Sequence, residues 1–239
     1  MDRIERYRNR FTLIELLAVV ALISLLMAIG VPAFSRMIRG SRVDEFARGI
    51  KLGLEQAQMR AASERRYVAV IFPNGSLGDN AQKLKPYLLG GFRTAYLKKN
   101  GSSYTFVRWV DGSDWSNAPN GAALVKVGIA NFATDNGYVT GCSTSTGLLT
   151  GCQDLPLISV KDDDGTDLII GGPRAIIFTP YGSVDIKSKL YLLVSEALIE
   201  GTAVTYPTAK GTTGDDRYTT SNYKVLKINN LTGRVEFNE

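Results

Sequence analysis

Hydrophobic and polar positions follow three patterns along this chain, and the first is a long apolar run. Residues 11–34 are apolar or small at almost every position, and Glu15 is the one charged residue among them. At about 1.5 Å per residue the run makes roughly 36 Å of helix, enough to cross a hydrocarbon core of about 30 Å. It therefore predicts a membrane-spanning helix. A carboxylate costs on the order of 2.5–3.5 kcal/mol at the centre of such a span, so Glu15 either snorkels to the interface or serves a function.

The second pattern follows directly and is amphipathic. Apolar residues recur at steps of three and four, as on one face of a helix, while charged residues fill most of the other faces. The apolar positions are Val43, Phe46, Ala47, Ile50, Leu54, Ala57 and Ala61. We expect one helix from Phe11 to about Glu64. Pro32 cannot donate a hydrogen bond to the carbonyl of Ala28, and Gly30 loosens the same turn, so a bend is expected there.

The third pattern is that of β-strands and turns. Residues 67–72 form a strand-like run, and Asn100-Gly101 separates two more, 92–99 and 102–110, which predicts a hairpin. Residues 202–222 are rich in Gly, Thr, Ser and Asp and predict a mobile loop. Further strands are expected at 123–127, 155–160, 175–178, 190–195, 224–228 and 234–237. The predicted fold class is α+β, a long N-terminal helix packed on an antiparallel β-sheet domain.

Charge predicts which side of a membrane each part occupies. The first ten residues hold four arginines and two acids, a net charge of +2. A basic segment before the first span keeps the N-terminus in the cytoplasm and sends the remainder outside. The expected organisation is a cytoplasmic leader (1–10), a membrane-spanning helix (11–34), its amphipathic continuation (35–66) and one exported β-rich globular domain (67–239).

The residues around Glu15 carry a family resemblance. Phe-Thr-Leu-Ile-Glu-Leu-Leu at 11–17, after an Arg-rich leader, resembles the N-terminus of type IV pilins and type II secretion pseudopilins. The resemblance implies that a prepilin peptidase cuts between Arg10 and Phe11 and methylates the new amine of Phe11. It also implies that Glu15 pairs with the Phe11 amine of a neighbouring subunit. The family nearly always has Gly where this chain has Arg10. Either the peptidase accepts Arg, or the protein stays a full-length single-span membrane protein.

Three later motifs narrow the resemblance to minor pseudopilins of the GspH/FimT type. Ala57, Ala61 and Val68 repeat the spacing with which that family runs a helix into its first strand, although Gln58 replaces the usual arginine. Residues 177–182 and 231–237 resemble its strand ends, while the middle of the chain matches no family we can name.

The resemblance implies a minor pilin or pseudopilin of a type II secretion pseudopilus or a type IV pilus, incorporated near the tip. Its partners would be other pilin subunits, the prepilin peptidase, the inner-membrane assembly platform and the lipid bilayer. It would sit in the inner membrane as a single-pass protein with a periplasmic domain, and then enter the filament. No cofactor is implied.

The cysteine and histidine content of the chain bears on disulfide formation, catalysis and zinc binding. Cys142 and Cys152 lie in a stretch rich in Ser, Thr and Gly, where in an exported domain they predict a disulfide worth roughly 2–4 kcal/mol; two separate thiols are the alternative. The chain has no histidine, which excludes Ser-His-Asp and Cys-His nucleophiles and His-containing zinc sites. We therefore expect that this chain is not an enzyme.

Two polar stretches allow other functions. Arg93, Lys98, Lys99 and Arg108 alternate with aromatic residues, a mixture that grips phosphates and stacks bases, so a DNA-binding uptake pilin is one alternative. Half-buried strands show the same alternation. Residues 162–167 offer oxygens for calcium but fail the EF-hand register, which favours a polar turn.

An alternative interpretation, from a different class of protein, is that the chain is a secreted or tethered β-protein with an ordinary signal peptide. Ala28-Ile29-Gly30 offers small residues for a periplasmic cut. The N-terminal residue of the mature protein separates these alternatives.

Overall fold

The structure is a computed structural model that describes part of the chain. The described residues are 13–73, 84, 86–129, 134–135, 138–139, 155–156, 158–168, 174–200, 203–205 and 222–238. Among them, the side chains of residues 29–40 and of several short strands are not described. The chain divides into two compact units, residues 1–39 and 40–239.

The expected long helix is confirmed from its first described residue onward. Helix α1 runs over Leu13–Glu64 without interruption, and it passes through Gly30 and Pro32 as helix. The bend expected at these two residues stays a prediction. Helix α1 ends where Arg65 adopts a left-handed conformation with φ of 53°, and the N–H of Arg66 donates to the carbonyl of Ala61 at 3.2 Å.

Strand β1 (Tyr67–Phe72) follows α1 directly and lies inside the first antiparallel sheet. The order is β10 (Arg174–Phe178), β1, β2 (Gly91–Asn100) and β3 (Ser103–Trp109), and β4 (Ser116–Asn117) pairs with β2. The predicted hairpin between β2 and β3 is confirmed, with Gly101 in the turn at φ of +62°.

The second sheet is also antiparallel and is built from later parts of the chain. Its order is β15 (Val235–Asn238), β14 (Tyr223–Ile228), β11 (Leu190–Glu196) and β5 (Ala122–Gly128). Three short ladders complete the described strands: β6 (Thr134–Asp135) with β7 (Tyr138–Val139), β8 (Val160–Lys161) with β9 (Asp167–Leu168), and β12 (Leu198–Glu200) with β13 (Ala203–Thr205).

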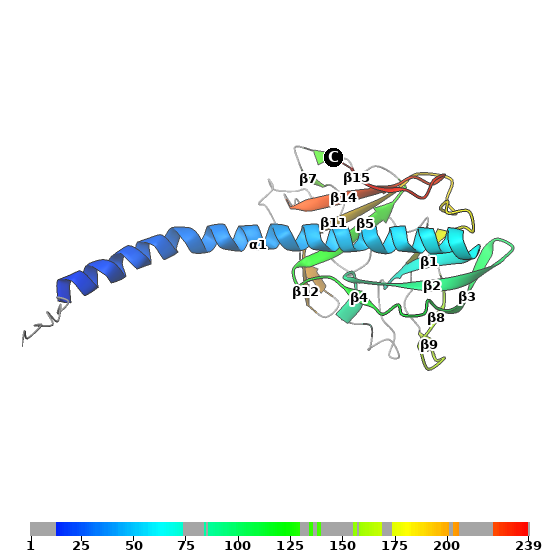
Figure 1. Ribbon diagram of the computed structural model, residues 1–239, viewed down its shortest axis with the longest axis horizontal. Helices are drawn as coiled ribbons and strands as arrows, with labels where there is room; N and C mark the ends of the chain where they lie inside the picture. The colour runs from blue at the N-terminus through cyan, green and yellow to red at the C-terminus, as the bar shows by residue number, and fades with distance from the viewer. Residues whose placement is uncertain are drawn as a thin grey trace, which may run out of the picture. The chain divides into compact units, whose positions relative to one another are not determined.

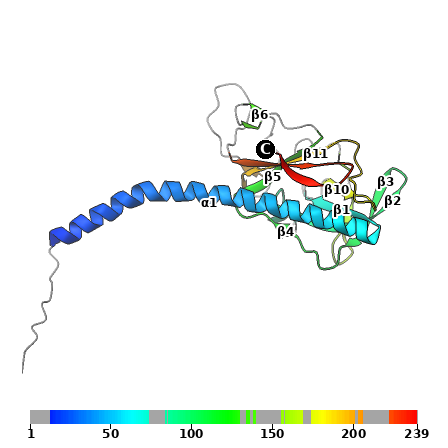
Figure 2. The ribbon, with the colours of Figure 1, turned by 45° about the horizontal axis from the view of Figure 1, so that its top comes forward.

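The amphipathic half of α1 packs on both sheets. All seven apolar positions predicted for its inner face are at most 4% exposed. They join residues of both sheets in one hydrophobic cluster, and Figures 1 and 2 show this part of α1 lying along one side of the strands. Because side chains alternate along a strand, Val68 and Val70 face this cluster, whereas Ala69 and Ile71 join a second cluster.

The second cluster covers the opposite face of the first sheet. It includes Ile158 and Leu168, together with Trp109 from β3. All buried members of the two clusters lie between Val43 and Val235, so the unit 40–239 contains its own described core. The described architecture is α+β, a helix packed on antiparallel sheets, as the sequence pattern predicts.

Two expectations about the strands were wrong. The predicted strand at 155–160 is absent among its described residues except for Val160, which belongs to β8. Leu155 joins the first cluster and Ile158 the second, and Pro156 has no N–H for a ladder, so the segment crosses between clusters instead of pairing. Ala203–Thr205 is a strand rather than loop, and residues 206–221 lie outside the described part of the chain.

Candidate assembly surfaces

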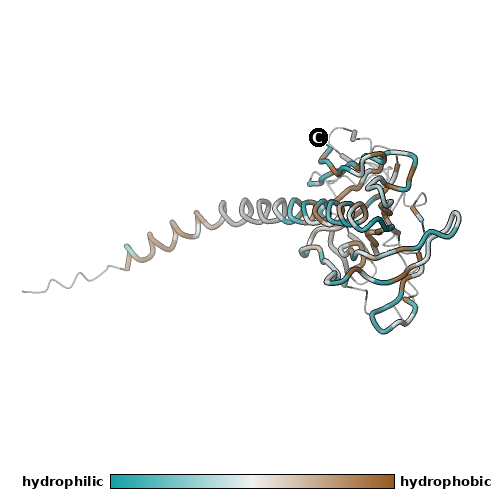
Figure 3. The backbone as a smooth tube through the Cα atoms, turned by 45° about the vertical axis from the view of Figure 1, so that its right-hand side comes forward, coloured by the Kyte–Doolittle hydropathy of each residue, from teal (hydrophilic) through white to brown (hydrophobic). Residues whose placement is uncertain are grey.

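The N-terminal part of α1 carries an unusual surface. Residues 13–28 are all exposed, from 83% at Leu13 to 45% at Ile23 among the large apolar side chains. Figure 3 shows this segment as hydrophobic along nearly its whole length. A helix that is apolar on every side is normally covered by protein or lipid. The segment therefore has the chemistry of a surface that another apolar body covers.

The polar groups of this segment have defined positions. The Ser24 hydroxyl donates to the carbonyl of Val20 at 2.8 Å, so its hydrogen bond is made within the helix. Glu15 lies in the first described turn of α1. A carboxylate there is near the positive end of the helix dipole. Arg10 and Phe11, the predicted cleavage and methylation site, lie outside the described residues.

Within the described part of the chain, no helix combines the length and the apolar character that a membrane crossing requires. The apolar run of the sequence, residues 11–34, extends at both ends beyond the side chains that are described.

At the C-terminal end of α1, three motifs that are distant in sequence come together. Gln58 donates a hydrogen bond through Nε2 to the backbone carbonyl of Thr232. The turn at Gly182 lies against the same helix, so that a Cβ on Gly182 would be 3.6 Å from the Cβ of Ala62. The two turns contact each other, since the N–H of Val184 donates to the carbonyl of Asn230 at 2.8 Å. These three segments are the ones from which the sequence pattern predicts a pseudopilin of the GspH/FimT type, and that prediction stays untested.

Glycine is required where the two turns meet. Gly182 and Gly233 have φ of +82° and +70°, a region that favours glycine. A Cβ on Gly233 would lie 2.0 Å from the carbonyl oxygen of Gly182. The close approach of the two backbones therefore depends on the missing side chain.

Each of these turns presents a large exposed side chain. Tyr181 is 92% exposed and Leu231 is 79% exposed. The N–H groups of Leu231 and Thr232 both donate to the side-chain oxygen of Asn229, at 3.0 and 3.2 Å, which fixes the second turn. We call Tyr181 and Leu231, with the turns 179–183 and 229–234, the knob.

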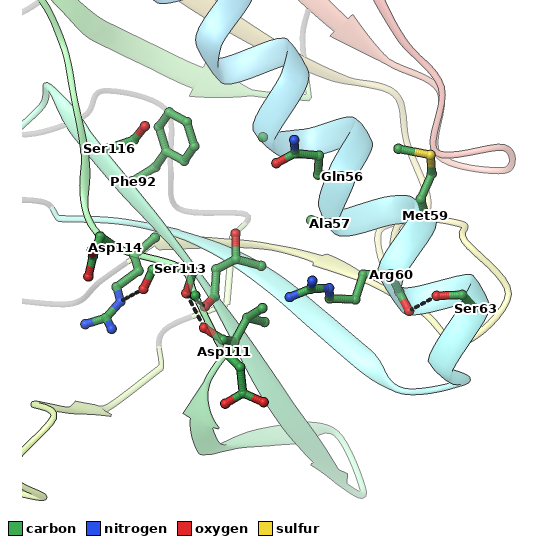
Figure 4. Close-up of a pocket in the computed structure, with 15 residues that line it drawn as sticks. Gln56, Ala57, Met59, Arg60, Ser63, Phe92, Asp111, Ser113, Asp114 and Ser116 are labelled. Carbon is green, nitrogen blue, oxygen red and sulfur yellow. Dashed lines mark hydrogen bonds between the residues drawn. The ribbon is translucent and has the colours of Figure 1, made fainter.

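A groove lies between α1 and the segment that follows β3. Its volume is about 630 Å³. Figure 4 shows Gln56, Arg60 and Ser63 on the helix side and Asp111, Ser113 and Asp114 on the other, with Phe92 nearby. Gly53 admits the Phe92 ring, because a Cβ there would lie 2.4 Å from Phe92 Cε2. We call this space the groove, and its lining consists of Gly53, Gln56, Ala57, Met59, Arg60 and Ser63 of α1, residues 92–94, residues 110–114 and Ser116.

A hydrogen bond ties the end of α1 to β2 beside the groove. The buried Tyr96 hydroxyl donates to Glu64 Oε1 at 2.9 Å, and Arg60 Nε lies 3.7 Å from the same oxygen. Burial raises the pKa of Tyr96 above its ordinary value of 10.0, and the hydrogen bond to Glu64 and the charge of that carboxylate raise it further.

Three of the four predicted DNA contacts bind carboxylates within the protein. Arg93 is 7% exposed, and its guanidinium donates to both oxygens of Asp163 at 3.0 and 3.1 Å and lies on the ring of Trp109. Lys99 pairs with Asp185 at 2.9 Å, and this hydrogen bond raises the pKa of Lys99.

The other two positions are exposed, as Lys99 is. Arg108 pairs with Asp111, and this hydrogen bond raises the pKa of Arg108. Lys98 is exposed as well. The aromatic partners Phe92, Tyr96 and Trp109 are buried. At Arg93, Phe92 and Trp109 the alternation of charge and aromatic residues therefore belongs to the packing of the sheet.

Residues 162–166 of the acidic stretch form the turn between β8 and β9, and Asp167 begins β9. The N–H of Asp162 donates to the carbonyl of Thr166 at 2.8 Å, and Gly165 has φ of +80°. The sequence did not predict the pairing of Asp163 with Arg93, because the two lie 70 residues apart. Among the described residues, no group of three or more acidic or cysteine side chains could hold a metal ion. Cys142 and Cys152 lie outside the described residues, so their disulfide stays a prediction.

Comparison with known proteins gives little support for an identity. No family model and no curated protein matches the chain. A solved structure that matches is the type IV minor pilin FimU of Pseudomonas aeruginosa, with 12% identity over 86% of this chain and 91% of that one. Its TM-score is 0.36. A likeness of this size does not by itself establish a fold or a function.

Proposed function

We propose that this chain is a minor pilin or pseudopilin, a subunit of a type IV pilus or of a type II secretion pseudopilus. Residues 11–34 anchor it as a single span in the inner membrane, with residues 67–239 in the periplasm. The same helix then carries it into the filament, near the tip. The observation that carries the proposal is the exposed apolar surface of residues 13–28, with one acid in its first turn.

The apolar surface needs a partner that is itself apolar. Burying it yields about 25 cal/mol for each Å² removed from water. Lipid can cover all sides of the helix in the membrane, and the helices of neighbouring subunits can cover them in a filament. One segment can thus serve both states.

Glu15 gives the assembled state its register. After cleavage between Arg10 and Phe11, the chain would begin with a charged amine four residues before Glu15. A carboxylate is costly in an apolar environment by itself, but it is tolerated beside an opposite charge. Pairing Glu15 with the Phe11 amine of a neighbouring subunit would place opposite charges side by side in the apolar interior of the filament.

A cut at a signal-peptidase site after Gly30 fits the helix less well. Helix α1 is continuous from Leu13 to Glu64, so such a cut would fall inside it. The exposed apolar segment would then be discarded and would have no role in the mature protein. This consideration favours retention of residues 11–34.

Replacing Glu15 by Ala tests the proposal. We expect Glu15→Ala to insert in the membrane as the unchanged chain does, and to be lost from sheared filaments. Glu45→Ala is the matched control, because Glu45 is an exposed acid on the same helix beyond the apolar run. Equal incorporation of Glu15→Ala and the unchanged chain would contradict the docking role of Glu15.

A further inference from the structure

The knob and the groove lie on opposite flanks of the same helix. Successive residues of an α-helix are rotated by about 100°, so Gln58 and Ala62, which face the knob, lie roughly 160° around α1 from Gln56 and Arg60, which line the groove. Both features belong to the unit 40–239. A projection on one flank and a recess on the other allow two copies to meet side by side.

We propose that the knob of one copy docks in the groove of a second copy of this chain. Such a contact is heterologous, because each copy uses two different surfaces and keeps one of each free. Heterologous contacts that do not close into a ring build open helical assemblies. The contact extends the proposed function by giving the globular domains a direct role in assembly.

The knob has the properties of an interface anchor. Tyr181 and Leu231 are the most exposed large apolar side chains in the described part of residues 40–239. Their turns are held by Gln58, by each other and by Asn229, so little conformational freedom remains to be lost on docking. Aromatic side chains such as tyrosine dominate the binding energy of many interfaces.

The groove offers matching partners for a tyrosine and a leucine. Phe92 and Val110 provide apolar lining, and Arg60 can lie against an aromatic ring as a cation on its face. Ser113 and Asp114 provide oxygens that can accept a hydrogen bond from the tyrosine hydroxyl. A side chain with an apolar ring and a polar tip fits this mixture.

Charges around the two surfaces are complementary. Arg65 and Arg66 follow Ala62, which lies against Gly182 of the knob, and both arginines are exposed. The outer side of the groove carries the exposed carboxylates of Asp114 and of Asp111, the latter paired with Arg108. Docking would bring cations of one copy toward acids of the other, which favours this partner over a like-charged one.

Photo-crosslinking from position 181 tests the contact. The full chain, with p-benzoylphenylalanine in place of Tyr181, is irradiated in its membrane, as an equal mixture of isotopically light and heavy copies. We expect adducts between light and heavy copies at residues that line the groove, such as Gln56, Arg60 or Asp114, and not at Gln58 or Ala62, which face the knob. The same label at Val107, which is 54% exposed on β3, should give no groove adduct.

A second experiment blocks the groove with a large side chain and measures the yield of the crosslink. Ser63→Trp places a large side chain in the groove, and Arg48→Trp places one on an exposed position outside its lining. We expect Ser63→Trp to lower the adduct yield about thirtyfold, the effect of losing a hot spot worth about 2 kcal/mol, and Arg48→Trp to leave it unchanged. Adducts elsewhere, adducts within one copy only, no adduct, or equal yield in Ser63→Trp would overturn the proposal.

An experiment on the unit 40–239 alone, which contains its own described core, distinguishes failure of this proposal from failure of the proposed function. If a concentrated solution of 40–239 gives groove adducts but the full chain is absent from filaments, the contact between knob and groove stands and the filament role is wrong. Full chains that enter filaments without groove adducts would retain the filament role and overturn the knob contact.

Discussion

The Nε2 of Gln58 donates a hydrogen bond to the carbonyl of Thr232, a residue 174 positions later in the chain. The contact ties the amphipathic half of α1 to the turn between β14 and β15, and so to the second sheet. It also holds the backbone that presents Leu231. The stability of the domain and the shape of the knob therefore depend on the same residue.

Removing this donor should weaken the domain. We expect Gln58→Ala to lower the free energy of unfolding of 40–239 by about 1–2 kcal/mol, because the Thr232 carbonyl loses its partner. Urea titration measures the change. Gln56→Ala is the control, since Gln56 is exposed on the same helix, and it should change stability by less than about 0.5 kcal/mol.

Gly233 of the knob and Gly101 of the β2–β3 turn should respond differently to the same substitution. Gly233→Ala should cost about 3 kcal/mol or more, because its Cβ would collide with the carbonyl oxygen of Gly182 in addition to the strain of a positive φ. Gly101→Ala has a similar φ and nothing within 4 Å, so only the strain of about 1 kcal/mol should appear. Equal losses in urea titrations would refute the close approach of the two turns.

The end of α1 can be stabilised. Arg65 has φ of 53°, which is strained for any residue except glycine. Arg65→Gly should therefore raise the free energy of unfolding by about 0.5–1 kcal/mol, measured by thermal and urea unfolding. Arg66→Gly, one residue later and outside the positive-φ positions, should bring no gain. A loss of stability in Arg65→Gly would mean that this helix end is formed differently.

Alkaline pH should weaken the contact between α1 and β2. Burial and the hydrogen bond to Glu64 raise the pKa of Tyr96, so the folded chain keeps a proton that the unfolded chain loses near pH 10.0. The resulting stability is complete below pH 10.0 and is lost as the pH rises through the raised pKa. Unfolding free energies measured across this range should fall less steeply in Tyr96→Phe. Tyr181→Phe, at a 92% exposed position, should keep the full decline.

Most of the described fold could be predicted from local sequence patterns. The apolar face from Val43 to Ala61 specified the packing of α1, and Asn100-Gly101 specified the hairpin of β2 and β3. The apolar residues at 155–160 led to a wrong prediction of a strand, because a segment that crosses between two clusters has the same composition as a buried strand.

The candidate surfaces could be predicted less well from the sequence, because they depend on contacts between residues that are far apart in the chain. Alternating aromatic and basic residues suit both a nucleic-acid surface and a half-buried sheet. Asp163, far along the chain, pairs with Arg93, and the Trp109 ring lies against the same guanidinium. The knob likewise depends on turns that are adjacent only in space.

The N-terminal residue of the protein recovered from membranes and from sheared filaments tests the central claim most directly. The proposed function requires a chain that begins at Phe11, with a methylated amine available to a neighbouring Glu15. Sequencing that finds Phe11 in both fractions is the result we expect. A chain that begins at Val31, or one that keeps Met1 and is absent from filaments, would contradict assembly through this helix.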